Sequence, residues 1–136
     1  MNIHASCVAL GGRGLLILGD AGAGKSTLAL AMMALGAGLV ADDRTDLHLN
    51  EGRLFADAPA SLRGMIEARG VGILIAEAKG PIEVTLAVDL SQTETERLPL
   101  WQERAFLGVK LPLVRGPMRP HLEAALMQYL AKGRAL

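Results

Sequence analysis

The residues with the clearest chemical meaning lie in the stretch GDAGAGKST, Gly19 to Thr27. It fits the pattern G-x-x-x-x-G-K-[ST] of a phosphate-binding loop, whose backbone N–H groups surround phosphate oxygens. The apolar residues before it predict a strand and those after it predict a helix, which is the context that this motif requires. The stretch therefore predicts nucleotide binding, but it does not identify the acceptor of a phosphoryl group. The alternative is a glycine-rich turn that matches the pattern by chance.

Each residue type in this loop has a physical role. Its glycines allow backbone conformations that a Cβ disfavours, and the helix that follows directs its positive end toward an anion. Lys25 can reach the β- and γ-phosphates, and Ser26 can place its hydroxyl on Mg²⁺. The expected nucleotide-binding residues are Gly19, Asp20, Ala21, Gly22, Ala23, Gly24, Lys25, Ser26 and Thr27.

Phosphoryl transfer also needs a group that deprotonates the nucleophile and cations that neutralise the developing charge. Asp42 and Asp43 end a predicted strand, and sites in α/β sheets lie at the carboxyl ends of strands. One carboxylate could act as a base and the other could lie near a metal. A solvated turn in the stretch DDRTD explains the pair equally well from the residues alone.

Four further side chains could complete such a site. His4 lies in the predicted strand before the loop, although a strand histidine with satisfied hydrogen bonds is the ordinary alternative. Glu67 could ligate Mg²⁺ and Arg69 could bind phosphate, or both could belong to a charged surface turn. Arg97, in a polar segment, could clamp an anion or be a solvated loop arginine.

Composition limits the class of protein. With 14 basic and 14 acidic residues the formal net charge is zero, so no basic excess indicates nucleic acid or an anionic membrane as a partner. No apolar run approaches the roughly 20 residues that span a bilayer, and the N-terminal residues lack a secretory signal pattern. The single cysteine, Cys7, excludes an internal disulfide and predicts a small buried side chain in a strand. We expect a cytoplasmic protein.

Apolar runs and turn signals predict one α/β domain over residues 1–136, with a mixed sheet, several β-hairpins and flanking helices. Strands are expected at 3–10, 15–19, 37–43, 46–50, 53–56, 71–78 and 82–90. Helices are expected at 25–36 and 119–133, the second with Pro120 in its first turn and leucines at i+4 spacing. Residues 58–70 are expected to form a short helix or turn, and residues 91–108 a loop.

Together these segments resemble the catalytic domain of the HPr kinase/phosphorylase family, which phosphorylates a serine of HPr, the phosphocarrier of the sugar phosphotransferase system. The resembling stretches run from about Ile3 to about Leu100. They are IHASCVALGGRGLLILGDAGAGKSTLAL, LVADDRTDL, APASLRGMIEARGVGIL and TERLPL. The phosphate loop alone is a strong motif, but the order and spacing of the stretches are more specific.

The resemblance implies a role for each matching position. The loop from Gly19 to Ser26 binds the nucleotide, with Lys25 on phosphate and Ser26 on magnesium. Asp43 is the general base that activates the acceptor serine, and Asp42 precedes it in the paired acids.

Four other positions match the family. The resemblance implies that His4 is the active-site histidine and that Glu67 is the second magnesium ligand, in a signature from Ile66 to Ile75. Arg69 belongs to that signature. Arg97 matches a catalytic arginine by a looser alignment.

Beyond single residues, the resemblance implies a fold like that of PEP carboxykinase, ATP and Mg²⁺ as cofactors, an HPr-like partner and a homo-oligomer. Three departures stand out. The chain begins almost at the catalytic domain, as a short form would; the signature reads EARG in place of EIRG; and PLVRGPMRP only loosely matches a C-terminal stretch tied to the phosphorylase direction. Two alternatives stay open: a kinase of another acceptor, and a nucleotide-binding regulatory module without transfer activity.

Overall fold

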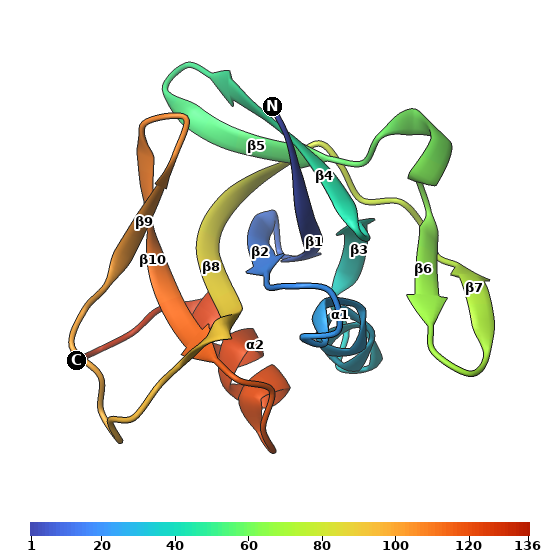
Figure 1. The fold of residues 1–136 in the computed structure, drawn as a ribbon. Helices are drawn as coiled ribbons and strands as arrows, with labels where there is room; N and C mark the ends of the chain where they lie inside the picture. Colours follow the sequence, from blue (N-terminus) through green and yellow to red (C-terminus); the bar gives the residue numbers. More distant parts are fainter.

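The computed structural model describes all residues from 1 to 136 (Figure 1). Its elements are β1 (Asn2–Leu10), β2 (Arg13–Leu18), α1 (Lys25–Ala34), β3 (Gly38–Ala41), β4 (Arg44–Asn50), β5 (Arg53–Asp57), a 3-10 turn (Ala60–Leu62), β6 (Met65–Ala68), β7 (Gly72–Ile75), β8 (Ile82–Thr93), β9 (Glu103–Phe106), β10 (Val109–Gly116) and α2 (Leu122–Lys132).

The main sheet curves until it meets itself. Its strand order is β2-β1-β4-β5-β8-β10-β9, and β2 also pairs with β8, so that β2, β1, β4, β5 and β8 form a closed circuit of pairings. The pairings β2–β8 and β10–β8 are parallel and the others are antiparallel. The predicted mixed α/β domain is confirmed as a mostly antiparallel sheet with two helices.

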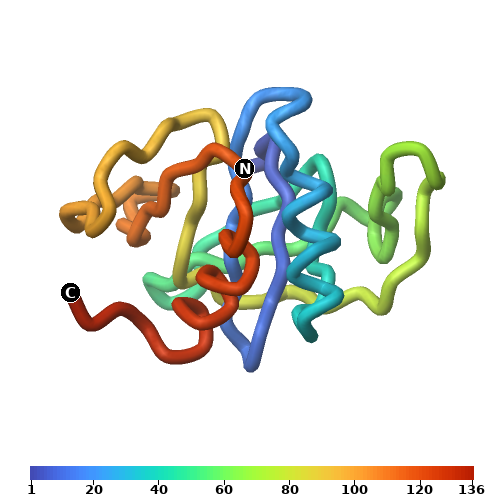
Figure 2. The backbone as a smooth tube through the Cα atoms, turned by 90° about the horizontal axis from the view of Figure 1, so that it is seen from below, coloured from blue at the N-terminus to red at the C-terminus, as the bar shows by residue number.

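Two apolar clusters lie on the two faces of this curved sheet. The first is enclosed by the sheet itself and includes Cys7, Leu16, Leu47 and Phe106. The second lies between the sheet and both helices and includes Ile17, Leu28 and Leu126. Figure 2, seen from below, shows the two helices crossing the same side of the sheet. Because α1 packs on this face, the loop that precedes it is held at the end of β2.

The hairpin of β6 and β7 forms a separate two-stranded sheet beside α1 (Figure 1). Only its inner side is covered, because Ile66 is 1% exposed whereas Ile73 and Ile75 are 63% and 92% exposed. The hairpin therefore stands at the edge of the molecule and brings Glu67 next to α1.

Several local expectations need correction. Residues 65–68, expected in a helix or turn, form β6, because they pair with β7 through four residues. The segment expected to be a loop at 91–108 contains the end of β8 and all of β9. Pro120 precedes His121, the N-cap of α2, and is outside the helix. Cys7 is confirmed as a fully buried strand residue, and burial raises the pKa of its thiol.

Neither helix has both the length and the apolar character that a membrane crossing requires.

The leucine row of α2 gives a test of the helical layer. Leu126 is 1% exposed within the second apolar cluster, so Leu126→Ala is expected to lower the free energy of unfolding by about 2–5 kcal/mol through lost burial and a residual cavity. Gln128 on the same helix is exposed, and Gln128→Ala should change the free energy of unfolding by less than about 0.5 kcal/mol. Urea denaturation measures both, and equal losses would contradict the described packing of α2.

Candidate active site

The phosphate loop connects the end of β2 to the start of α1. Gly22 and Gly24 have φ of 84° and 103°, in the left-handed region that glycine tolerates, and Gly24 is the N-cap of α1. No side chain caps this helix end and no acidic residue lies in its first turn. The first N–H groups of an α-helix have no acceptor within the helix. The loop thus presents free donors and a positive helix end toward the solvent.

Lys25 closes the base of this loop. Its ammonium donates to the carbonyl oxygens of Gly19 at 2.7 Å and Asp20 at 3.2 Å, and the residue is only 9% exposed. The Asp20 N–H in turn donates to Ser91 Oγ at 2.7 Å, which ties the loop to β8. A positive charge is therefore held beside the loop N–H groups.

Asp42 is buried at the end of β3 and joins three segments. Its Oδ1 accepts hydrogen bonds from the hydroxyls of Ser6 and Ser26, both at 2.7 Å, and its Oδ2 accepts one from the Glu67 N–H at 3.0 Å. The residue is 6% exposed. Such a contact between a loop serine and a strand-end aspartate resembles the magnesium-holding pair of phosphate-loop enzymes.

Asp43 follows as the central residue of a very tight turn. The Arg44 N–H donates to the Asp42 carbonyl oxygen at 2.7 Å, and Asp43 has a φ of 68°. A γ-turn with a positive central φ is rare and strained. The Asp43 carboxylate lies 3.8 Å from His4 Nδ1, beyond hydrogen-bond distance, and the two side chains are 68% and 61% exposed.

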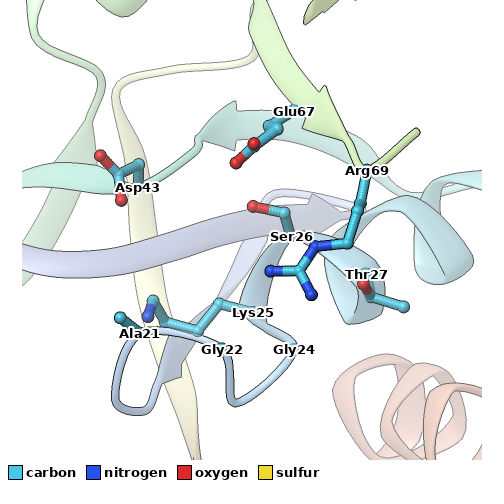
Figure 3. A pocket seen from close by; sticks show the side chains of 9 residues that line it. All are labelled: Ala21, Gly22, Gly24, Lys25, Ser26, Thr27, Asp43, Glu67 and Arg69. Atoms are coloured by element: carbon cyan, nitrogen blue, oxygen red, sulfur yellow. The ribbon is translucent and has the colours of Figure 1, made fainter. Parts of the chain in front are cut away.

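A cavity of about 170 Å³ lies between the phosphate loop and these acids (Figure 3). In this view the Glu67 carboxylate lies above the Ser26 hydroxyl, and the Arg69 guanidinium extends toward the loop. The cavity is lined by Ala21, Gly22, Gly24, Lys25, Ser26, Thr27, Asp43, Glu67 and Arg69. These side chains could surround a bound polyphosphate and a cation.

A second cavity of about 340 Å³ adjoins the first and is largely apolar. Asp43 and Glu67 line both cavities, so the exposed carboxylate of Asp43 stands at the boundary between a polar space and an apolar one.

The expected site residues therefore divide into two groups. The loop, the paired aspartates, His4, Glu67 and Arg69 come together around or beside the first cavity. Arg97 does not join them: it is exposed in the segment between β8 and β9 and lines none of the five principal cavities. The assignment of Arg97 thus stays a prediction from resemblance.

Ser6 is the site residue that inspection of the sequence missed. It lies two positions after His4 on β1, and alternate residues of a strand share one face. That spacing was the available signal, but a serine in an apolar strand carries no motif of its own. Its importance becomes visible only through contacts with residues 36 and 37 positions away.

Comparisons with known proteins identify the family of the chain. A family model described as the HPr serine kinase C-terminal domain matches residues 1–132. The chain belongs to this family. A protein of Caldanaerobacter subterraneus subsp. tengcongensis named HPr kinase/phosphorylase is 33% identical, over 96% of this chain and 47% of the relative. A protein of Streptococcus thermophilus with the same name is 35% identical, over 96% of this chain and 48% of the relative.

The chain thus spans about half the length of the curated relatives that it matches. Among solved structures, the HPr(Ser) kinase/phosphatase from Coxiella burnetii matches with a TM-score of 0.80 and 29% identity. That match covers 97% of this chain and 94% of the other. As a member of the HPr serine kinase C-terminal domain family, the chain has its family's fold over nearly its whole length.

The hydrogen bonds of Asp42 lead to a stability prediction. Asp42→Ala removes the acceptor of the fully buried Ser6 hydroxyl and of two more donors, so it should lower the free energy of unfolding by about 2–4 kcal/mol. Asp46→Ala is the control: its carboxylate accepts one exposed hydrogen bond from Asn2, and its loss should cost less than about 0.5 kcal/mol. Chemical denaturation measures the free energy of unfolding of both variants. A small decrease for Asp42→Ala would contradict the role described for this carboxylate.

Proposed function

We propose that this chain transfers the γ-phosphoryl group of ATP to a serine of HPr or of an HPr-like phosphocarrier. The observation that carries the proposal is the placement of the exposed Asp43 carboxylate on the same cavity as the phosphate loop. The names of the relatives and of the matched solved structure support the choice of HPr as acceptor. A regulatory module that only binds nucleotide would not need a carboxylate at this position.

The chemical step follows from these positions. The acceptor serine Oγ approaches through the apolar side, loses its proton to the Asp43 carboxylate and forms a bond to the γ-phosphorus. The bond from that phosphorus to the oxygen bridging to the β-phosphorus breaks, and ADP leaves. Lys25 and the N–H groups at the start of α1 stabilise the charge that spreads over the transferring group.

The chain also offers a fitting site for Mg²⁺. This ion is usually held by one or two carboxylates together with substrate phosphates and waters. The Glu67 carboxylate and the Ser26 hydroxyl both line the cavity beside the loop (Figure 3). No cluster of three His, Cys, Asp or Glu side chains forms a closed cage. Asp42, bonded to Ser26, would orient the serine hydroxyl toward the ion. Bound there, Mg²⁺ would neutralise charge on the phosphates.

Three side chains take supporting roles in this proposal. His4, 3.8 Å from the Asp43 carboxylate, would orient that base. Arg69 extends toward the phosphate loop and would contact a phosphate oxygen. Arg97 would reach the site only if its segment moved, and it is assigned a role by resemblance alone.

We also propose the reverse activity, in keeping with the name HPr kinase/phosphorylase of the relatives. An oxygen of inorganic phosphate attacks the phosphorus of phosphoserine, pyrophosphate forms, and Asp43 returns a proton to the serine Oγ. Residues 112–120 match the family stretch tied to this direction only loosely, so the reverse reaction is assayed separately.

The wider expectations belong to the same proposal. We infer one domain over residues 1–136, a phosphate-loop fold like that of PEP carboxykinase, and assembly into a homo-oligomer. We place the activity in the cytoplasm, where the free and buried Cys7 is compatible with a reducing environment.

Direct assay tests the proposed reaction. The chain, ATP, Mg²⁺ and HPr should together yield HPr with one added phosphate on serine, detected by mass spectrometry of acid-stable phosphopeptides. Phosphorylated HPr with inorganic phosphate should release pyrophosphate. Nucleotide binding without any transfer to HPr would contradict the proposed acceptor, and transfer to another protein or a small molecule in the same assay would replace it.

Substitution of the proposed base separates catalysis from binding. Asp43→Asn removes the charge but keeps a side chain that tolerates the left-handed backbone, so transfer should fall by about 100-fold or more while nucleotide affinity changes less than about threefold. Asp46→Asn removes the same charge from β4, outside both cavities, and should transfer normally. Initial-rate kinetics measures the rate of transfer, and nucleotide titration measures the affinity. Loss of nucleotide binding in Asp43→Asn would show that this carboxylate does not act as the base.

A further inference from the structure

Ser6 is fully buried in β1 and contacts both members of the aspartate pair. Its hydroxyl donates to Asp42 Oδ1 at 2.7 Å and accepts a hydrogen bond from the Asp43 N–H at 3.3 Å. One hydroxyl can serve both contacts because it has one donor and two acceptor lone pairs. We propose that Ser6 is a positioning residue, which sets the turn that presents the Asp43 carboxylate to the reacting atoms.

The turn at Asp43 needs such support. A non-glycine residue seldom adopts a φ of 68°, and strained backbone persists only where its surroundings determine it. Here β1 holds the residue from both sides: Ser6 accepts from its N–H, and the Ala5 N–H donates to its carbonyl oxygen at 3.2 Å. Two consecutive residues of one strand therefore determine the direction in which the Asp43 side chain leaves the backbone.

The same hydroxyl reaches the phosphate loop through a shared acceptor. Asp42 Oδ1 accepts from Ser6 and from Ser26, the second residue of α1. Ser6 thereby restrains the proposed base through the Asp43 backbone and the proposed metal-binding hydroxyl through one carboxylate oxygen. Ser6 itself lines neither of the two cavities. Its contribution is the relative placement of two groups that must act on the same phosphoryl group.

The kinetic part of this inference rests on the proposed function. Displacement of a catalytic group by a distant substitution can cost up to about 100-fold in rate, so a partial relaxation in Ser6→Ala should lower kcat for serine phosphorylation by about tenfold. The KM for ATP should stay within about twofold, because the loop N–H groups and Lys25 are not altered. Ser6→Thr retains the hydroxyl and should recover kcat to within about threefold of the original chain.

Thr45 provides the matched control. It is also fully buried, on β4, and its hydroxyl donates to the Ala5 carbonyl oxygen at 2.8 Å and forms no hydrogen bond with either aspartate. Thr45→Val removes one buried hydroxyl from the neighbouring strand, so it should also destabilise the chain but leave kcat within about twofold.

A second measurement does not depend on the reaction. In NMR hydrogen exchange on the full chain, the Asp43 amide should exchange about tenfold faster in Ser6→Ala, since it loses its acceptor. It should be unchanged in Thr45→Val. If the original chain phosphorylates no HPr, the proposed function fails, and the exchange rate of the Asp43 amide still decides whether Ser6 holds the turn.

The outcomes that overturn the inference are specific. The inference is wrong if Ser6→Ala leaves the exchange rate of the Asp43 amide unchanged, or leaves kcat unchanged. It is also wrong if Thr45→Val lowers kcat as much as Ser6→Ala does. If Ser6→Ala does not fold, Ser6→Cys preserves a side chain of similar shape with a weaker hydrogen-bonding group, and both measurements should change in the same direction.

Discussion

Asp42 accepts hydrogen bonds from β1, from α1 and from β6, which are three segments that no backbone pairing joins at this point. Because Asp42 is only 6% exposed, loss of those donors would leave a buried carboxylate without hydrogen-bond partners. The phosphate loop, the Asp43 turn and the hairpin that carries Glu67 are therefore linked through one buried carboxylate. Removal of any donor would disturb more than one wall of the cavity.

The closed sheet explains why these segments meet. The pairing of β2 with β8 closes the circuit, and it places β2 between β1 and β8 in the middle of the sheet. The loop that leaves β2 is thus fixed at its start by neighbours on both sides and at its end by α1. The turn after β3 reaches the same end of the molecule, since β3 runs antiparallel to β1. The sheet thus fixes the positions of the loop after β2 and the turn after β3, which carry the side chains of the candidate site.

The sequence predicted the parts of this site that are local. The phosphate loop and the start of α1 at Lys25 follow from spacing within nine residues, and the hairpins follow from glycine-containing turns. The hydrogen bonds of Asp42 could not be predicted from the sequence, because two of its partners, Ser6 and Glu67, are 36 and 25 residues away along the chain. The strand β6 was misread because its partner β7, rather than its own four residues, stabilises it. Arg97 is the opposite case. The family resemblance assigns it a catalytic role, yet its side chain is exposed in the segment between β8 and β9.

The exposure of the His4 and Asp43 side chains, 61% and 68%, has a consequence for how such a site would work. Sites of phosphoryl transfer gain from the exclusion of water, which many enzymes achieve with a closing lid. Here the proposed base, Asp43, faces open solvent, so water would compete with the acceptor serine whenever nucleotide were bound without the acceptor protein. Under the proposed reaction, the acceptor protein would itself be the missing cover. Recognition of the partner and protection of the nucleotide from wasteful hydrolysis would then be one event.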